Sequence, residues 1–317
     1  MQPLSHGPSP GCRLVLGVDF TSAPSARKPI TVAVGRCEFA SGTGIYRLEE
    51  VRGLETLAAF EEFLAAAGEP WLGGFDLPFG QPRRLIEHEG WPTDWPQFVR
   101  FYCSQPRQSL REVFRRWCDA RPAGDKFAWR QADKPAGSSP AMRWTNPPVA
   151  WMMHAGIGRM LDAGLAFPAH AHAGTGLERI ALEAYPGFTA RQVCRRSYKS
   201  DAAAGRTEDR AANRRVILRA LVAGSAGLAV ALVIRPAWSR RLADDWGGDL
   251  LDAVICGLQA AHAATRPGYG LPAAVDPLEG WIASVPPPAS GQVRRGGEDH
   301  GRAALRRGRL DLSPLVE

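Results

Sequence analysis

The sequence predicts an α/β fold in which a mixed five-stranded sheet is flanked by helices. Three short runs of apolar and β-branched residues, at 13–19, 30–35 and 44–52, are separated by hairpin-like spacings, which predicts three antiparallel neighbours. A helical pattern at 54–67 then precedes a fourth apolar run at 71–76. Because a helix between two strands favours a crossover to parallel pairing, the sheet is expected to be mixed.

The rest of the chain is predicted to be mostly helical. A fifth strand is expected at 179–184, followed by a basic amphipathic helix at 208–221 and an apolar helix at 248–264. The region of about 81–176, between the fourth and fifth strands, is predicted to be a helical insertion on the core. Its helical patches lie at 83–89, 95–102, 109–117 and 149–163.

These elements predict one domain over residues 13–285. Residues 1–12 are polar and proline-rich, and we expect a flexible tail there. From 286 to 317 the sequence turns to proline, glycine and arginine, which predicts a disordered basic tail.

The overall charge favours an acidic partner. The 317 residues carry a formal net charge of +7, which is compatible with nucleic acid as the first candidate, although a charge of this size can also serve solubility alone. The six cysteines form no C-x-x-C pair and no zinc-like spacing. No secretory signal and no apolar run of membrane-spanning length is seen, so a cytoplasmic protein without a membrane segment is expected.

Two carboxylates end predicted strands. Asp19 closes the first apolar run and Asp76 closes the fourth. Parallel neighbours would bring both to one edge of the sheet, where open α/β sheets place their ligands. A carboxylate at the end of a buried strand is costly to desolvate unless it is paired or binds a cation. The alternative is that each acid caps the turn that follows it.

Three further acids are candidates for the same edge. Asp249 and Asp252 share one face of the apolar helix, because they are three residues apart. Helix capping alone explains Asp249 well, whereas Asp252 lies among apolar residues and needs a partner. Glu183 ends the fifth predicted strand, and its alternative role is a salt bridge to a nearby arginine.

Clustered carboxylates indicate a hard divalent cation. Mg²⁺ and Mn²⁺ prefer oxygen ligands, and two such ions about 4 Å apart can activate a water and stabilise the leaving oxygen of a phosphodiester. The hypothesis is a two-metal site in which Asp19, Asp76, Asp249 and Asp252 are ligands. The catalytic acids would be Asp19, Asp76, Asp252 and Glu183.

Five sequence blocks resemble those of domain-of-unknown-function family 429, a family described as predicted RNase H-like nucleases. The resemblance spans roughly residues 13–283, and no single block carries it alone. The blocks are 17–19 (GVD), 75–80 (FDLPFG), 183–186 (EAYP), 248–256 (GDLLDAVIC) and 279–282 (EGWI).

At the superfamily level the chain is similar to RuvC-type Holliday-junction resolvases. In those proteins one acid ends the first strand, another ends the fourth, and a D-x-x-D-A pair opens the last helix. Asp19, Asp76 and the pair Asp249 and Asp252 stand at the matching positions. The resemblance implies an RNase H-like core and a two-metal nuclease, but the insertion at 81–176 is not part of the minimal resolvase pattern.

Basic and aromatic residues are candidates for substrate contacts. Lys199 could hold a phosphate near the metal site, although a solvated position beside the basic helix is the alternative. Arginines and tryptophans of the insertion suit phosphate clamping and base stacking, or else pack the insertion itself. This set comprises Arg111, Arg115, Arg116, Trp117, Lys126, Trp129, Arg130, Arg143 and Trp144.

Two other functions remain open from the sequence. The first is an ATP-dependent phosphotransferase of the sugar-kinase and actin type, whose domains share this core. Such enzymes place a glycine-containing phosphate loop after the first strand, whereas Asp19 is followed by Phe-Thr-Ser-Ala-Pro. The second is a non-catalytic nucleic-acid-binding protein that kept the fold.

Overall fold

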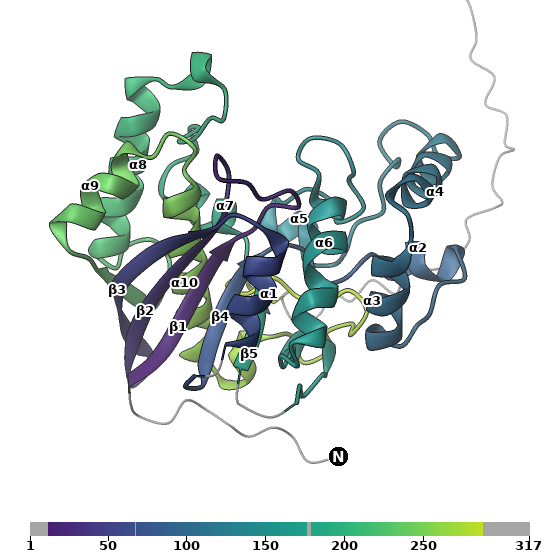
Figure 1. The fold of residues 1–317 in the computed structure, drawn as a ribbon, viewed down its shortest axis with the longest axis horizontal. Helices are drawn as coiled ribbons and strands as arrows, with labels where there is room; N and C mark the ends of the chain where they lie inside the picture. The colour runs from purple at the N-terminus through teal and green to yellow at the C-terminus, as the bar shows by residue number, and fades with distance from the viewer. Residues whose placement is uncertain (1–11, 67, 176–178, 288–317) are drawn as a thin grey trace, which may run out of the picture. The chain divides into compact units, whose positions relative to one another are not determined.

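A mixed sheet of six strands organises the chain, in the order β5-β4-β1-β2-β3-β6 (Figure 1). The structure is a computed structural model that describes residues 12–66, 68–175 and 179–287. β2 pairs antiparallel with β1 and β3, while β1–β4, β4–β5 and β3–β6 are parallel. The strands are β1 (Cys12–Asp19), β2 (Ile30–Ala40), β3 (Thr43–Leu54), β4 (Trp71–Asp76), β5 (Arg179–Glu183) and β6 (Val230–Val233).

The predicted mixed α/β sheet is therefore confirmed, with one correction to the strand count. The sequence predicts five strands, and the sheet has a sixth, β6, which pairs with β3 at the edge. β6 has only four residues and lies within an apolar stretch between two helices. So short a run has no periodicity that separates a strand from buried helix, and only its pairing with β3 defines it.

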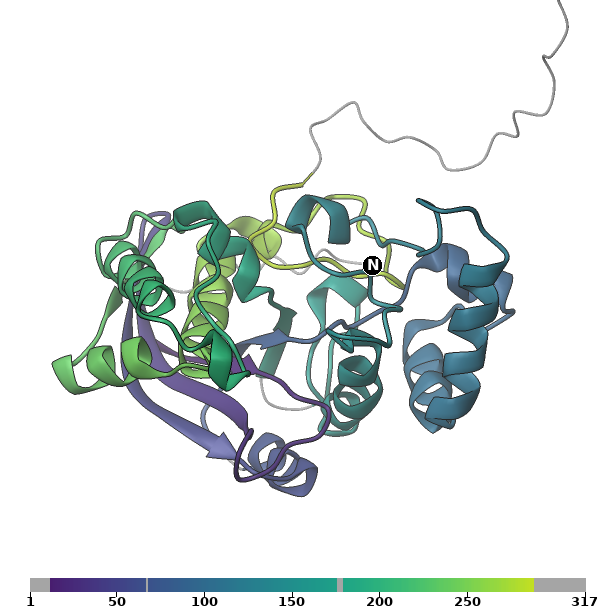
Figure 2. The same ribbon diagram turned by 90° about the horizontal axis from the view of Figure 1, so that it is seen from above.

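Helices cover both faces of the sheet. α10 packs on β1, β2 and β4 from one face, and α1 lies on the opposite face (Figure 1, Figure 2). Two separate apolar cores result, one around α10 and the other around α1 and α6. The helices are α1 (Leu57–Ala65), α2 (Arg83–His88), α3 (Trp95–Ser104), α4 (Arg107–Asp119), α5 (Asp133–Ala136), α6 (Val149–Asp162), α7 (Pro186–Val193), α8 (Glu208–Val222), α9 (Pro236–Asp244) and α10 (Asp249–Ala264).

The helical insertion between the fourth and fifth strands is present. It contains α2 to α6 and a short 3-10 helix, η1 (Pro168–His170). The insertion shares one continuous apolar core with the α1 face of the sheet, because Phe98, Phe114 and Met160 belong to the same cluster as Val18 and Phe75. Two further 3-10 turns, η2 (Ala203–Gly205) and η3 (Pro267–Gly270), lie outside it.

Glycines let α10 approach the two central strands closely. A Cβ atom on Gly17 would lie under 3.0 Å from backbone atoms of Ala253 and Gly257, and one on Gly74 would meet the backbone of Cys256 in the same way. Since side chains two residues apart point to the same face of a strand, the acids that follow each glycine by two positions also face α10. The spacing Gly-x-Asp in both strands thus brings two carboxylates under the start of this helix.

All described residues belong to one compact unit. The predicted tails at 1–12 and 286–317 fall outside the described residues except at their inner ends, where Cys12 begins β1. Within the described ranges, no helix is both long and apolar enough to cross a bilayer.

Candidate functional site

Asp19 and Asp76 lie side by side at the carboxyl ends of β1 and β4. They are direct partners in the parallel register of the two strands. Neither carboxylate makes a hydrogen bond or an ion pair with any other described residue, although both are largely removed from water. Two neighbouring half-buried carboxylates that form no ion pair are electrostatically unfavourable. This edge of the sheet is therefore short of positive charge.

The two strand-end acids hold their protons more tightly than ordinary aspartates. Burial raises the pKa of Asp19 well above its usual value, and Asp252 raises it further, while Lys199 opposes the shift. Burial also raises the pKa of Asp76 to about 7, again opposed by Lys199 and reinforced by Asp252. In both cases loss of hydration disfavours the charged form, and a cation placed between the carboxylates would restore it.

Asp252 lies beneath them in the first turn of α10 and is completely buried. Both of its carboxylate oxygens are in use. The Tyr198 hydroxyl donates to Oδ1 at 2.5 Å, and the Lys199 ammonium donates to Oδ2. The predicted need of Asp252 for a partner is met here by two side chains that are adjacent in sequence.

Asp249, one turn earlier on α10, lies at the margin of the cluster. Its carboxylate is 3.5 Å from the ammonium of Lys28, which also contacts the exposed Asp201 at 2.6 Å. Burial raises the pKa of Asp249, and Lys28 opposes this rise. Both acids of the D-x-x-D pair are therefore ion-paired with lysines, whereas the two strand-end acids are not.

Lys199 forms its ion pair with Asp252, and its charge also lowers the pKa of Asp19, Asp76 and Asp249. Burial works against its charge, but Asp252 and Asp19 raise the pKa of Lys199 well above its ordinary value. Its side chain is nevertheless 44% exposed. The Lys199 side chain thus pairs with a buried carboxylate while part of it remains in contact with solvent, which places it at the mouth of the cluster.

Glu183 reaches the same edge of the sheet but is engaged elsewhere. The guanidinium of Arg130 donates to its two oxygens at 2.6 and 2.7 Å, and the backbone N–H of Phe79 donates at 3.0 Å. Arg130 also pairs with the buried Asp133 at 2.8 Å. Glu183 therefore forms the salt bridge to an arginine that the sequence left open as its alternative role. This salt bridge also corrects the grouping of Arg130 with substrate-facing bases, because the side chain of Arg130 is only 2% exposed.

Trp144 packs against the apolar core of the insertion, and Arg143 is half-buried. Trp144 stacks on Phe114 with ring centroids 5.9 Å apart, and it packs against Phe127. The Nε of Arg143 is buried without a hydrogen-bond partner among the described residues. In the part of the chain that the structure describes, neither side chain contacts the carboxylate cluster, so both match the packing alternative.

The carboxylate oxygens of the cluster fit a divalent cation to which the protein supplies only a few of the ligands. Asp19 and Asp76 offer carboxylate oxygens that have no other partner among the described residues. Among the described residues, however, there is no group of three or more His, Cys, Asp or Glu side chains that could hold one metal ion. Mg²⁺ commonly uses one or two carboxylates and completes its shell with water and substrate phosphate. Two neighbouring aspartates suit that mode of binding, and the residues that the structure describes form no closed protein cage.

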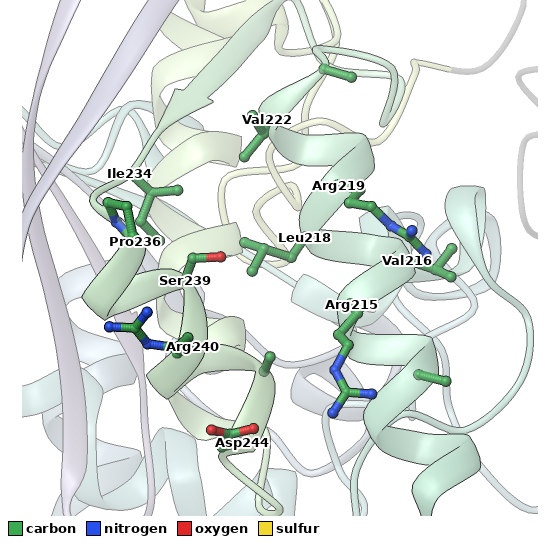
Figure 3. A pocket seen from close by; sticks show the side chains of 13 residues that line it. Arg215, Val216, Leu218, Arg219, Val222, Ile234, Pro236, Ser239, Arg240 and Asp244 are labelled. Atoms are coloured by element: carbon green, nitrogen blue, oxygen red, sulfur yellow. The ribbon is translucent and has the colours of Figure 1, made fainter.

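A groove of about 1000 Å³ lies elsewhere, between α8 and α9 (Figure 3). Leu218, Val222 and Ile234 form its apolar floor, with Arg215 and Arg240 at its margins. None of the predicted site acids is among its lining residues. The carboxylate cluster is therefore the better basis for assigning a function, because its chemistry is more specific than that of this open apolar groove.

Three features of the site are missing from the sequence predictions. Lys28 lies in a loop with no motif that distinguishes it. The contact of Tyr198 with Asp252 joins residues 54 positions apart. Gly248, whose φ is +77°, begins α10 directly beside Lys199, and the Gly-Gly pair before Asp249 was the available signal for this close approach.

Comparison with protein-family models, with curated proteins and with solved structures found no match for this chain.

Proposed function

We propose that this protein is a divalent-metal-dependent hydrolase that cleaves phosphodiester bonds in nucleic acid. The observation that carries the proposal is the pair Asp19 and Asp76. They are opposed in register at the carboxyl ends of two parallel strands and have no cationic partner among the described residues. A protein retains such a destabilising arrangement where function requires it.

In this proposal Asp19 and Asp76 hold a Mg²⁺ or Mn²⁺ ion. The bound ion would supply Lewis-acid stabilisation of the phosphoryl oxygens and a water of lowered pKa. The residues of the chain hold the two carboxylates in place through the close packing of α10 on Gly17 and Gly74. Lys199, at the mouth of the cluster, can receive a phosphate oxygen as a point charge.

Nucleic acid is proposed as the substrate because of the charge and chemistry around the site. The chain has a formal net charge of +7, and Arg111 and Arg115 on α4 are exposed. Phosphate contacts of this kind position a nucleic acid without reading its sequence. The strand order, with β2 antiparallel between β1 and β3, also supports the RNase H-like core that the resemblance to family 429 implies. The proposal places the protein in the cytoplasm, where its six cysteines would stay reduced.

The test is cleavage of end-labelled single-stranded and duplex DNA and RNA in Mg²⁺ or Mn²⁺. Wild-type protein should cut at least one of these substrates, and chelation of the metal should abolish cleavage. Asp19→Asn and Asp76→Asn should each lose activity by at least about a hundredfold, since each removes a charged ligand. Asp119→Asn, which changes an exposed acid on α4, is the matched control.

Two outcomes would redirect the assignment. Binding of oligonucleotide that persists without metal, with no cleavage of any substrate, would identify a non-catalytic nucleic-acid-binding protein. Equal cleavage by wild type and Asp19→Asn would show that the strand-end carboxylates do not carry the reaction.

A further inference from the structure

We propose that the Lys199 ammonium is a built-in cation of the carboxylate cluster that takes the place of a second divalent ion. In this arrangement Asp252 is committed to Lys199, and the cluster takes up one ion, on Asp19 and Asp76. The inference rests on the proposed function, and it replaces the two-ion site expected from the sequence with a site of one metal ion and one lysine.

The first observation is that both oxygens of Asp252 already accept a hydrogen bond from a side chain. Tyr198 donates to Oδ1 at 2.5 Å, and Lys199 donates to Oδ2. Charge-assisted bonds to a fully buried carboxylate are strong, because no water competes for them. A metal ion bound to Oδ2 of Asp252 would place two further positive charges beside the Lys199 ammonium, so that the two cations compete for the same carboxylate.

The second observation is that the backbone carrying Lys199 is fixed on both sides. Three hydrogen bonds hold residues 197–200 against α8 and the turn before α10. Asn213 donates to the carbonyl of Ser197 at 2.9 Å, Arg214 donates to that of Tyr198 at 2.7 Å, and the N–H of Ser200 donates to the carbonyl of Trp246 at 3.0 Å. Arg214 is itself fully buried and also donates to the carbonyl of Ala243 at 2.7 Å.

The third observation is a seat for the lysine stem. Gly248 adopts a left-handed φ of +77° at the start of α10. A Cβ atom at this position would lie 2.8 Å from the Cβ of Lys199. Glycine is therefore favoured at this position for two reasons: it adopts the left-handed φ of the turn before the helix, and it leaves room for the side chain of Lys199. A mobile surface lysine would need neither this seat nor the anchored backbone.

The charges of the cluster balance with one divalent ion. When ionised, Asp19, Asp76, Asp249 and Asp252 carry four negative charges, and Lys199 and Lys28 supply two positive charges. Asp201 also pairs with Lys28, but its side chain is 75% exposed, so water solvates its charge and it is not counted with the cluster. The remaining two negative charges belong to the two strand-end acids and match one Mg²⁺ or Mn²⁺. A second divalent ion would leave the cluster with excess positive charge unless a lysine moved away.

The experiment counts ions directly and does not depend on activity. Mn²⁺ is titrated into full-length protein, and the free ion is measured by electron paramagnetic resonance to give the number bound per chain at saturation. Wild type should bind one ion. Lys199→Met should bind two, because Asp252 then becomes available. Lys199→Arg, which keeps the charge, should bind one, as should Lys126→Met, which removes an exposed lysine of the insertion.

Lys199→Gln provides a second uncharged variant in case Lys199→Met does not fold, and it too should bind two ions. Thermal unfolding in the absence of metal confirms that each variant is folded. Two ions in wild type, or one ion in a folded uncharged variant, would overturn the role of Lys199. Wild type without any bound Mn²⁺ would overturn the proposed metal site itself, which is a different result from either of these.

Discussion

The Cα of Gly17 on β1 lies so near α10 that a side chain there would collide with the backbone at Ala253. Gly74 on β4 has the same relationship with Cys256. The helix is therefore seated directly on the two strands whose ends carry Asp19 and Asp76. This contact sets the distance between the strand-end acids and Asp252, and it ties the stability of the fold to the geometry of the site.

Gly17→Ala should destabilise the protein by about 1–3 kcal/mol, because the added methyl meets backbone that cannot move independently. Urea unfolding measures the change. Gly68→Ala is the matched control, since a Cβ at Gly68 meets nothing within 4 Å. The same substitution at Gly17 should also weaken Mn²⁺ binding by displacing α10. Equal stability of the Gly17 and Gly68 variants would contradict the close packing.

Arg130→Met should cost about 3–5 kcal/mol, because it leaves the buried carboxylates of Glu183 and Asp133 without their partner. Chemical denaturation gives the loss. Combining it with Glu183→Gln should recover part of the stability, since one uncompensated charge is then removed.

The control for this prediction is Arg100→Met. Arg100 pairs with Asp162 at 2.8 Å, with both side chains more than 60% exposed, and its loss should cost less than about 1 kcal/mol. If Glu183→Gln abolished Mn²⁺ binding and left stability unchanged, Glu183 would be a ligand and the structural role assigned to it would be wrong.

At pH 8, above the raised pKa of about 7 of Asp76, Asp76→Asn should stabilise the metal-free protein by about 0.5–2 kcal/mol, because a half-buried charge that forms no ion pair becomes a neutral amide of the same shape. Mn²⁺ should raise the unfolding temperature of wild type, since the ion binds only the folded state, and should not raise that of the variant. Differential scanning calorimetry with and without Mn²⁺ checks both statements. Asp119→Asn should behave as wild type in both measurements. A less stable metal-free variant would show that Asp76 has a structural partner.

Stability should fall in acid through His170. Burial lowers the pKa of His170 to about 3, from an ordinary value of 6.5. Its Nδ1 bonds to the carbonyl of Pro277 at 2.6 Å, and its Nε2 has no hydrogen-bond partner among the described residues. Between pH 6.5 and pH 3 the imidazole of His170 is therefore protonated in the unfolded chain and neutral in the folded protein. The stabilisation is complete above pH 6.5 and is lost as the pH falls toward 3, by up to about 1.4 kcal/mol per pH unit.

His170→Gln isolates this contribution. The variant loses the stacking of the ring on Trp95 and the hydrogen bond to the Pro277 carbonyl at every pH, so its unfolding free energy at pH 8 reports the cost of these lost contacts without any contribution from protonation. Below pH 6.5 the difference between wild type and variant should shrink, because only wild type carries the penalty of protonation. A difference that stays constant from pH 8 to pH 4 would exclude His170 as the titrating group.

Local sequence was sufficient for the elements and for the positions of the main acids. Apolar runs that end in Asp19 and Asp76 define two strands and their last residues, and the periodicity of 248–264 defines α10, because these patterns lie within one element. Because the glycine and the aspartate are two residues apart in both strands, the sequence also shows that each carboxylate lies on the same face of the sheet as the glycine before it. The helical insertion between β4 and β5 followed from the same kind of local pattern.

Only the tertiary structure decided what each acid contacts. Asp252 meets Tyr198 and Lys199 across more than fifty residues of chain, and Glu183 meets Arg130 across a similar separation. β6 becomes a strand only through its pairing with β3. A local pattern records whether a side chain is buried, but the charge that neutralises it comes from a distant segment, and packing alone brings the two together.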